Sequence, residues 1–136
     1  NAILDIMANE KPDYHSIYTD DMPLVDKIRT IASEIYGAAD VTFSPEASRA
    51  LTKITDMGFG NYPVCIAKTQ YSLSDDAKLL GRPEGFTVHI REAYVSAGAG
   101  FVVAIAGSIM TMPGLPKSPA AERIDIDENG ETFGLF

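Results

Sequence analysis

Apolar residues recur at helical spacing in two segments of the first half of the chain. Residues 21–37 and 44–58 each place them three or four positions apart, which is typical of a helix with one buried face. Pro23 suits the first turn of the first helix, and Ser44-Pro45-Glu46 supplies a cap, a first-position proline and a first-turn acid for the second. The glycine that closes each range is predicted to end the helix. The apolar positions are Leu24, Val25, Ile28, Ile31, Ala32 and Ile35, then Ala47, Ala50, Leu51, Ile54 and Met57.

Four further segments have the length and pattern of strands. Residues 41–43 are short, and residues 63–67 form a continuous apolar run, as in a strand that is covered on both faces. Residues 86–95 alternate apolar and polar positions as a half-buried strand does, and residues 101–106 are again continuously apolar. The small residues at 96–100 favour a tight connection between these last two strands. A loop that cradles a ligand with its backbone N–H groups is the alternative.

Two shorter helices complete the pattern. Residues 4–8 predict a short helix. This helix lies inside a lead-in of residues 1–17, in which the other residues show no sustained period. Ser74, followed by two aspartates, is predicted to cap another that Gly81 closes. With helices early, strands late and some alternation between them, we expect an α/β fold: a mixed sheet flanked by helices, with a C-terminal β-hairpin, in one domain over residues 18–136.

The hairpin is predicted from Asn129-Gly130, which favours a two-residue turn with positive backbone torsions between strands at 123–127 and 131–135. The same region, residues 125–130, resembles the opening of a calcium loop, with oxygen ligands at alternate positions and glycine at the sixth. Position twelve of such a loop would be Phe136, which cannot supply the bidentate carboxylate. The turn is therefore the preferred interpretation.

Composition and charge narrow the classes of partner. The chain has 136 residues, enough for one domain, and 11 Lys and Arg against 19 Asp and Glu give a formal charge of -8. That charge would repel nucleic acid and anionic membranes over most of the surface. A bilayer-spanning run of about 20 apolar residues is absent from the sequence. A single cysteine, Cys65, predicts a reduced, cytoplasmic setting, and its apolar neighbours indicate a buried position.

Two loops carry the candidate chemistry. Residues 68–72 follow a buried strand and precede a predicted helix, a place where ligands gather in α/β sheets, although Asp75 and Asp76 would repel a phosphate. A plain capped helix is an equally good interpretation. Residues 110–116 are apolar and stiffened by two prolines, so they form either a packed connector or a preformed wall for a planar ligand. His15 and His89 have no partners at metal-ligand spacing, and we assign no metal site and no catalytic residue.

At these loops the sequence resembles a known family. The strings at 58–61, 63–72, 96–101, 109–116 and 134–136 closely resemble the C-terminal part of formate-tetrahydrofolate ligase, also called formyltetrahydrofolate synthetase. The resemblance implies that the chain is the C-terminal domain of a larger ATP-dependent ligase. That enzyme joins formate to tetrahydrofolate through formyl phosphate and uses Mg²⁺ and a monovalent cation, K⁺ or NH₄⁺. Its phosphate-binding loop lies upstream, so this chain alone is expected to be inactive.

The resemblance also implies which residues line the cleft. A proline between two glycines, followed by phenylalanine, offers a flat apolar surface for a purine. As further partners we expect the remaining domains of the same enzyme and, at full length, a homo-oligomer. The alternative is a non-catalytic domain for interdomain or subunit packing. Ser108 departs from an aspartate that many relatives carry, so the role of that carboxylate is open here. The expected adenine-binding residues are Gly81, Arg82, Pro83, Gly85 and Phe86, and the expected cleft-lining residues are Lys68, Thr69, Tyr71, Ser72, Met110, Met112, Pro113 and Gly114.

Overall fold

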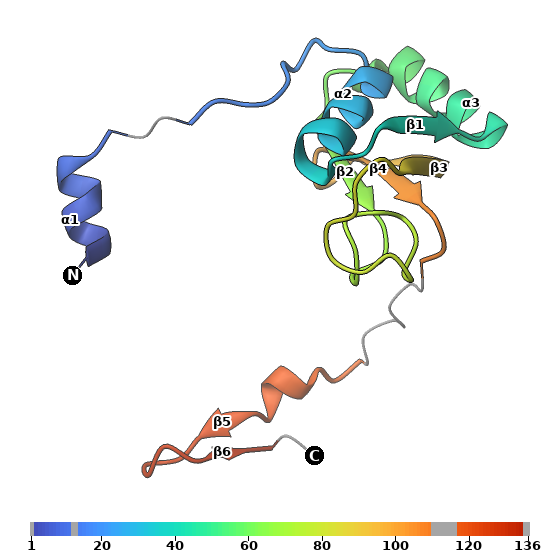
Figure 1. Ribbon diagram of the computed structural model, residues 1–136. Helices are drawn as coiled ribbons and strands as arrows, with labels where there is room; N and C mark the ends of the chain where they lie inside the picture. Colours follow the sequence, from blue (N-terminus) through green and yellow to red (C-terminus); the bar gives the residue numbers. More distant parts are fainter. Residues whose placement is uncertain (1, 12–13, 110–116, 135–136) are drawn as a thin grey trace.

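A four-stranded mixed sheet forms the centre of the computed structural model, which describes residues 2–11, 14–109 and 117–134 (Figure 1). Its strand order is β1-β3-β4-β2. The two outer strands run parallel to their inner neighbours, while β3 and β4 are antiparallel and joined by the tight connection at 97–100. The mixed α/β architecture is therefore confirmed. The strands are β1, Asp40–Phe43; β2, Val64–Ala67; β3, Thr87–Ser96; and β4, Phe101–Ala106.

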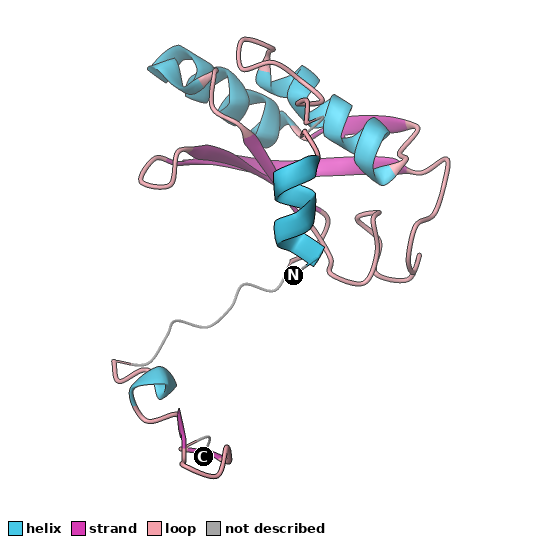
Figure 2. Ribbon diagram, turned by 90° about the vertical axis from the view of Figure 1, so that its left-hand side faces the viewer, coloured by secondary structure: helices cyan, strands magenta, loops and turns pink. Residues whose placement is uncertain are grey.

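Two helical segments cover one face of this sheet (Figure 2). The first is α2, Leu24–Thr30, continued by the π-helical η1, Ile31–Tyr36, and the second is α3, Pro45–Ile54, continued by the π-helical η2, Thr55–Phe59. Their apolar stripes pack on alternate residues of the strands, which is how a helix and a sheet bury one face each. The buried core comprises Leu24, Ile28, Ala32, Val41, Ala47, Leu51, Ile54, Val88, Ile90, Val102, Ala104 and Ala106.

The signals at the helix ends are largely confirmed. The Ser44 hydroxyl accepts a hydrogen bond from the Ala47 backbone N–H at 3.0 Å, which satisfies one of the free donors of the first turn. Pro23 precedes the first helical residue instead of occupying the first helical position. Gly37 and Gly58 adopt positive φ values of 77° and 89° where the helical segments end. The predictions for Ile35 and Met57 were wrong: these residues are 50% and 52% exposed, and Met57 lies in the distorted turn beyond α3.

Among the described residues, no helix covers the opposite face of the sheet (Figure 2), and this corrects the prediction for residues 63–67. Val64 and Ile66 of β2 pack against the core, whereas Cys65 points to the other face and is exposed instead of buried. Cys65 pairs with Val103, and Val103 pairs with Tyr94. Paired residues point to the same face of a sheet, so these three side chains form a row on what we call the open face.

Residues 74–81 form turns, so the helix predicted there was wrong. Ser74 does accept a hydrogen bond from the Asp76 N–H, as a cap would, but its hydroxyl is fully buried and also bonds the Ser72 hydroxyl at 2.9 Å. The Asp75 carboxylate binds His89 on β3 instead of the N–H groups of a first turn. These contacts with the rest of the domain fold the segment back on itself and prevent a helix.

The two ends of the chain form separate short elements away from the sheet (Figure 1). The helix α1, Ala2–Asn9, confirms the short helix of the lead-in but contains no buried residue. After the 3₁₀ turn η3, Ala120–Glu122, the strands β5, Asp125–Ile126, and β6, Thr132–Phe133, form the predicted hairpin. In the described part of the chain, the helices are too short or too polar to cross a membrane.

The hairpin turn is longer than predicted. The Asp127 N–H donates to the Glu131 carbonyl at 2.9 Å, which leaves three residues in the loop. Gly130 alone of these has a positive φ, 84°, whereas a two-residue Asn-Gly turn needs two such residues. The Asp127 carboxylate accepts hydrogen bonds from the N–H groups of Asn129 and Glu131, both at 2.8 Å. This side chain stabilises the longer loop, and the same hydrogen bonds lower the pKa of Asp127.

Lys27 is the largest fully buried side chain of the domain. Its ammonium donates to the backbone carbonyls of Asp20 at 2.7 Å, Gly60 at 3.1 Å and Tyr62 at 3.0 Å, and lies 5.8 Å from the centre of the Tyr18 ring. Burial lowers the pKa of Lys27, while the charges of nearby aspartates oppose this shift. The ammonium thus connects α2 to the segment before it and to the turn that leads into β2.

Replacing Lys27 with methionine is expected to lower the free energy of unfolding by roughly 2–4 kcal/mol, because three part-buried hydrogen bonds to backbone carbonyls are lost. Lys53→Met on the exposed side of α3 is the matched control and should change it by less than about 0.5 kcal/mol. Urea unfolding of the two variants measures the difference. Equal stabilities would contradict a structural role for the ammonium.

The lowered pKa of Lys27 adds a dependence on pH. Between that pKa and the ordinary value of 10.5, the unfolded chain binds more protons than the folded one. Stability contributed by this group therefore rises with pH in that alkaline window and is constant near neutrality. The rise should be missing in Lys27→Met.

Candidate functional site

The loops at 68–72 and 81–86 meet at one end of the sheet. The Gly81 N–H donates to the Tyr71 carbonyl at 3.1 Å, and the Gly81 carbonyl accepts from the Leu73 N–H at 2.8 Å. Ser72 and Gly81 thereby form a short parallel bridge. Two of the three loops expected to line a cleft are thus brought together. The third, with Met110, Met112, Pro113 and Gly114, lies outside the described residues.

Lys68 stabilises the first loop from within. Its ammonium donates to the backbone carbonyls of Thr69, at 3.3 Å, and Ser72, and lies 5.0 Å from the centre of the Tyr36 ring at the end of η1. Burial lowers the pKa of Lys68, and the charge of Asp75 acts in the opposite direction. With these partners, the ammonium holds the loop against η1 in place of extending toward an anion.

The other residues predicted in this loop divide by exposure. Thr69 and Ser72 are buried, at 8% and 5% exposed, whereas Tyr71 is 62% exposed. The Ser72 and Ser74 hydroxyls bond each other, and the Thr69 hydroxyl accepts from the Tyr71 N–H at 3.3 Å. The hydroxyls therefore fix the backbone of the loop, and Tyr71 offers its ring to whatever binds there.

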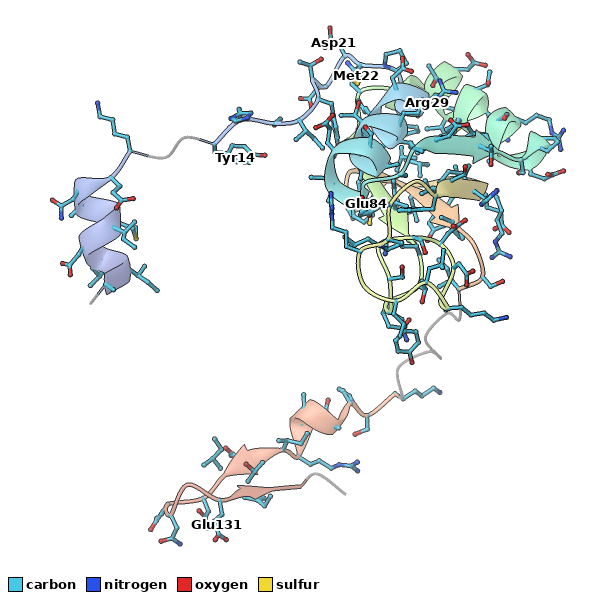
Figure 3. All side chains as sticks on the ribbon, in the orientation of Figure 1. Tyr14, Asp21, Met22, Arg29, Glu84 and Glu131 are labelled. Atoms are coloured by element: carbon cyan, nitrogen blue, oxygen red, sulfur yellow. The ribbon has the colours of Figure 1, made fainter. Side chains whose placement is uncertain are left out.

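The segment 81–86 also combines residues that fix its backbone with residues that are accessible. Gly81 and Gly85 both have positive φ, 70° and 69°, and bend the chain on either side of Arg82, Pro83 and Glu84. Arg82 forms an exposed ion pair at 3.3 Å with Glu84, which is labelled in Figure 3. Gly81, Arg82 and Gly85 are exposed and Pro83 is half-buried.

Both ends of this second segment are anchored. The Arg82 guanidinium lies against Gly37: a Cβ at that glycine would come 3.2 Å from Nη2. The cation is thus placed at the carbonyl end of η1, where a positive charge is favourable. Phe86 packs against the core, and its carbonyl accepts from the Ala39 N–H at 2.8 Å. Phe86 therefore supports the segment from below, and Arg82 and Pro83 form its accessible surface.

One pair of residues near these loops was missed by the sequence reasoning. The Asp75 Oδ2 accepts hydrogen bonds from the His89 N–H at 2.8 Å and from the His89 Nδ1 at 3.0 Å. The Asp75 side chain is 10% exposed and that of His89 is 66% exposed. The expected helix at 74–81 concealed the contact, because it assigned Asp75 to a helix terminus. In the described ranges, no group of three or more His, Cys, Asp or Glu residues is arranged to hold a metal ion.

Four hollows lined by described residues lie away from these loops. One of about 390 Å³ lies between α2 and α3 and has an apolar floor that includes Leu24, Phe43 and Leu51. Another of about 400 Å³ is lined by residues 14–18 of the lead-in together with Ile31 and Ile35. The remaining two lie beside Ala38 and along α3. None of these hollows is lined by a residue of 68–86, so they are poor candidates for the same site.

Comparison with protein families decides the identity of the chain. The family model described as formate--tetrahydrofolate ligase matches residues 1–136, which is the whole chain. The chain belongs to the formate-tetrahydrofolate ligase family. Formate and tetrahydrofolate, the substrates in the family's name, place it in one-carbon metabolism. The loops at 68–72 and 81–86 of this ligase chain are thus the two described segments from which its contribution to a substrate site can be argued.

The role of Lys68 gives a prediction for this part of the ligase chain. Lys68→Met keeps the aliphatic stem but removes the donor to two carbonyls, so we expect the free energy of unfolding to fall by about 1 kcal/mol, a value reduced for partial exposure. Lys78→Met, in the same loop but exposed, should leave stability within about 0.5 kcal/mol. Urea unfolding provides the comparison. If both variants are as stable as the parent, Lys68 is free to bind a ligand and the structural role is wrong.

Proposed function

We propose that this chain is the C-terminal portion of an ATP-dependent ligase that joins formate to tetrahydrofolate through formyl phosphate, and that it lines the nucleotide and folate cleft. The supporting observation is the convergence of the loops at 68–72 and 81–86 in a chain whose whole length matches the family. In α/β folds, ligand sites are assembled from loops at one end of the strands.

Within this proposal, the exposed surface of the second loop contacts the adenine or ribose of ATP. Gly81 shapes the turn through its hydrogen bonds to the first loop, Arg82, Pro83 and Gly85 offer accessible surface with a flat apolar ring, and Phe86 supports them from the core. Tyr71 extends the same surface from the first loop, while Lys68, Thr69 and Ser72 keep that loop in shape. Met110, Met112, Pro113 and Gly114 are proposed to complete the wall.

The phosphate chemistry is assigned to other parts of the enzyme. The complete enzyme is proposed to need ATP, Mg²⁺ and a monovalent cation, K⁺ or NH₄⁺, but the described residues contain no group of three or more His, Cys, Asp or Glu that could hold a metal ion. A loop that cradles the β- and γ-phosphates is missing from the sequence as well. We therefore propose that the chain by itself is inactive, and that the complete enzyme is a cytoplasmic homo-oligomer.

A packing role is the second candidate, and exposed apolar side chains favour it. Ile3, Leu4 and Met7 of α1 are 75%, 65% and 73% exposed, and Tyr94 on the open face is 51% exposed. An eight-residue helix is too short to be stable alone, so α1 needs a covering surface. Contacts of this kind are compatible with cleft lining, because a domain that lines a cleft must also pack against its neighbours.

Kinetics of one variant of the complete ligase separates these roles. Pro83→Ser removes a flat apolar contact without touching the reacting groups. The binding of ATP is then weakened equally in the ground state and in the transition state. A loss of about 1.4 kcal/mol, within the usual range for a pocket contact, would raise the ATP KM roughly tenfold and leave kcat nearly unchanged. The KM values for formate and tetrahydrofolate should stay the same.

Pro119→Ser is the matched control, since Pro119 is also half-buried but lies beyond the sheet, before η3. It should alter none of the three KM values. If Pro83 only shapes a surface turn, its replacement will slightly lower thermal stability and leave the ATP KM alone. That result would remove residues 80–86 from the site.

A further inference from the structure

The loop between residues 68 and 86 passes directly over the end of β4, and Asp75 lies at the crossing. A Cβ at Gly107, the residue after β4, would come 2.5 Å from the Asp75 carbonyl oxygen and 3.2 Å from the Asp75 Cβ. The φ of Gly107 is +64°, which also favours glycine. Glycine at this position is therefore what allows the loop to lie so close to the sheet.

The Asp75 side chain extends this contact to the neighbouring strand. Its Oδ2 accepts from both the backbone N–H and the Nδ1 of His89 on β3, at 2.8 and 3.0 Å. The His89 carbonyl in turn accepts from the Gly107 N–H at 3.3 Å. One residue of the loop is thus joined to β3 and packed on the end of β4. With its side chain only 10% exposed, the carboxylate has little water to replace these bonds.

The other anchors of the loop lie at its margins. Lys68 holds the beginning of the loop against Tyr36, and Arg82 lies against Gly37 near its end. Both of these anchors are on η1, whereas Asp75 is the contact that fixes the middle of the loop to the sheet. Loss of the Asp75 contact would leave the accessible residues of the loop tethered at two ends and free between them.

We infer that Asp75 is a positioning residue: through His89 and Gly107 it holds the 68–86 loop in the place where Tyr71, Arg82 and Pro83 meet the substrate. The inference rests on the proposed function, because only a substrate site makes the position of this loop matter for activity. Asp75 acts through the loop and makes no contact with substrate in this account.

The test uses the complete ligase with three replacements and two readouts. Asp75→Ala removes the acceptor, and Asp75→Asn keeps an oxygen that can accept from the His89 N–H. Asp76→Ala is the control, since within the described ranges that carboxylate bonds the nearby Lys78 N–H and no other group. Hydrogen exchange followed by mass spectrometry reports on the amides of Leu73, Gly81 and His89, and steady-state kinetics reports on the KM values and kcat.

Asp75→Ala is expected to speed exchange in peptides covering 68–89 by about tenfold, the effect of losing roughly 1.4 kcal/mol of local stability. It should raise the ATP KM about fivefold while kcat changes less than about twofold. Asp75→Asn should restore most of the protection and most of the affinity, and Asp76→Ala should match the parent in both readouts. Gly107→Ala, which displaces Asp75 without removing it, should reproduce the Asp75→Ala exchange pattern.

The outcomes separate this inference from the proposed function. Unchanged exchange in Asp75→Ala overturns the positioning role, and the proposed function stands if Pro83→Ser still raises the ATP KM. Faster exchange with unchanged KM values also overturns the positioning role, because Asp75 then holds the loop in place but the loop does not contribute to substrate binding. If hydrogen exchange in Asp75→Asn is as fast as in Asp75→Ala, the hydrogen-bond account of the contact is overturned.

Discussion

The buried ammonium of Lys27 fixes the edge of the sheet from which the candidate site extends. Its three carbonyl partners belong to the segment just before α2 and to the turn before β2, and its neighbour Tyr18 accepts the Val64 N–H at 3.2 Å, at the start of that strand. Because β2 ends at Ala67, its position determines where the 68–86 loop begins. The Lys27 ammonium can be buried because three carbonyls accept its hydrogen bonds. Those carbonyls would in turn lose their donor without it, so the lysine and the carbonyls depend on each other.

The described helices cover one face of the sheet, and this arrangement determines how the loops of the domain are held in place. The covered face forms the core, while the open face and the ends of the strands are left to loops (Figure 2). A loop without a deep apolar contact must be held by polar groups, and three such contacts are present: Lys68 with Tyr36, Arg82 with Gly37, and Asp75 with His89. These contacts shape the backbone, and they leave Tyr71, Arg82 and Pro83 accessible. The division between buried supports and accessible contacts is what a preformed binding surface requires.

Local signals predicted most of this fold. Ser44 and the terminal glycines define the helices through backbone chemistry that depends on few neighbours, and the longer strands follow from alternation or from short continuous apolar runs. The errors have a common cause in tertiary context. Cys65 looked buried because an apolar run does not reveal which face of its strand the helices cover. Residues 74–81 looked helical because a cap signal does not reveal that Asp75 has a better partner 14 residues away on β3. The convergence of the two loops was expected because both were assigned to one cleft, but the Asp75–His89 contact needed the coordinates.

The central claim is that this chain completes the substrate cleft of a ligase whose phosphate machinery lies elsewhere. Reconstitution tests it most directly: the 136-residue chain and the remainder of the ligase are purified separately, and formation of ADP from ATP, formate and tetrahydrofolate is measured for each and for the mixture. The account predicts no ADP from the chain alone, little from the remainder, and formate- and tetrahydrofolate-dependent ADP from the mixture. ADP formed by the chain alone, or a remainder that is fully active without it, would contradict the account.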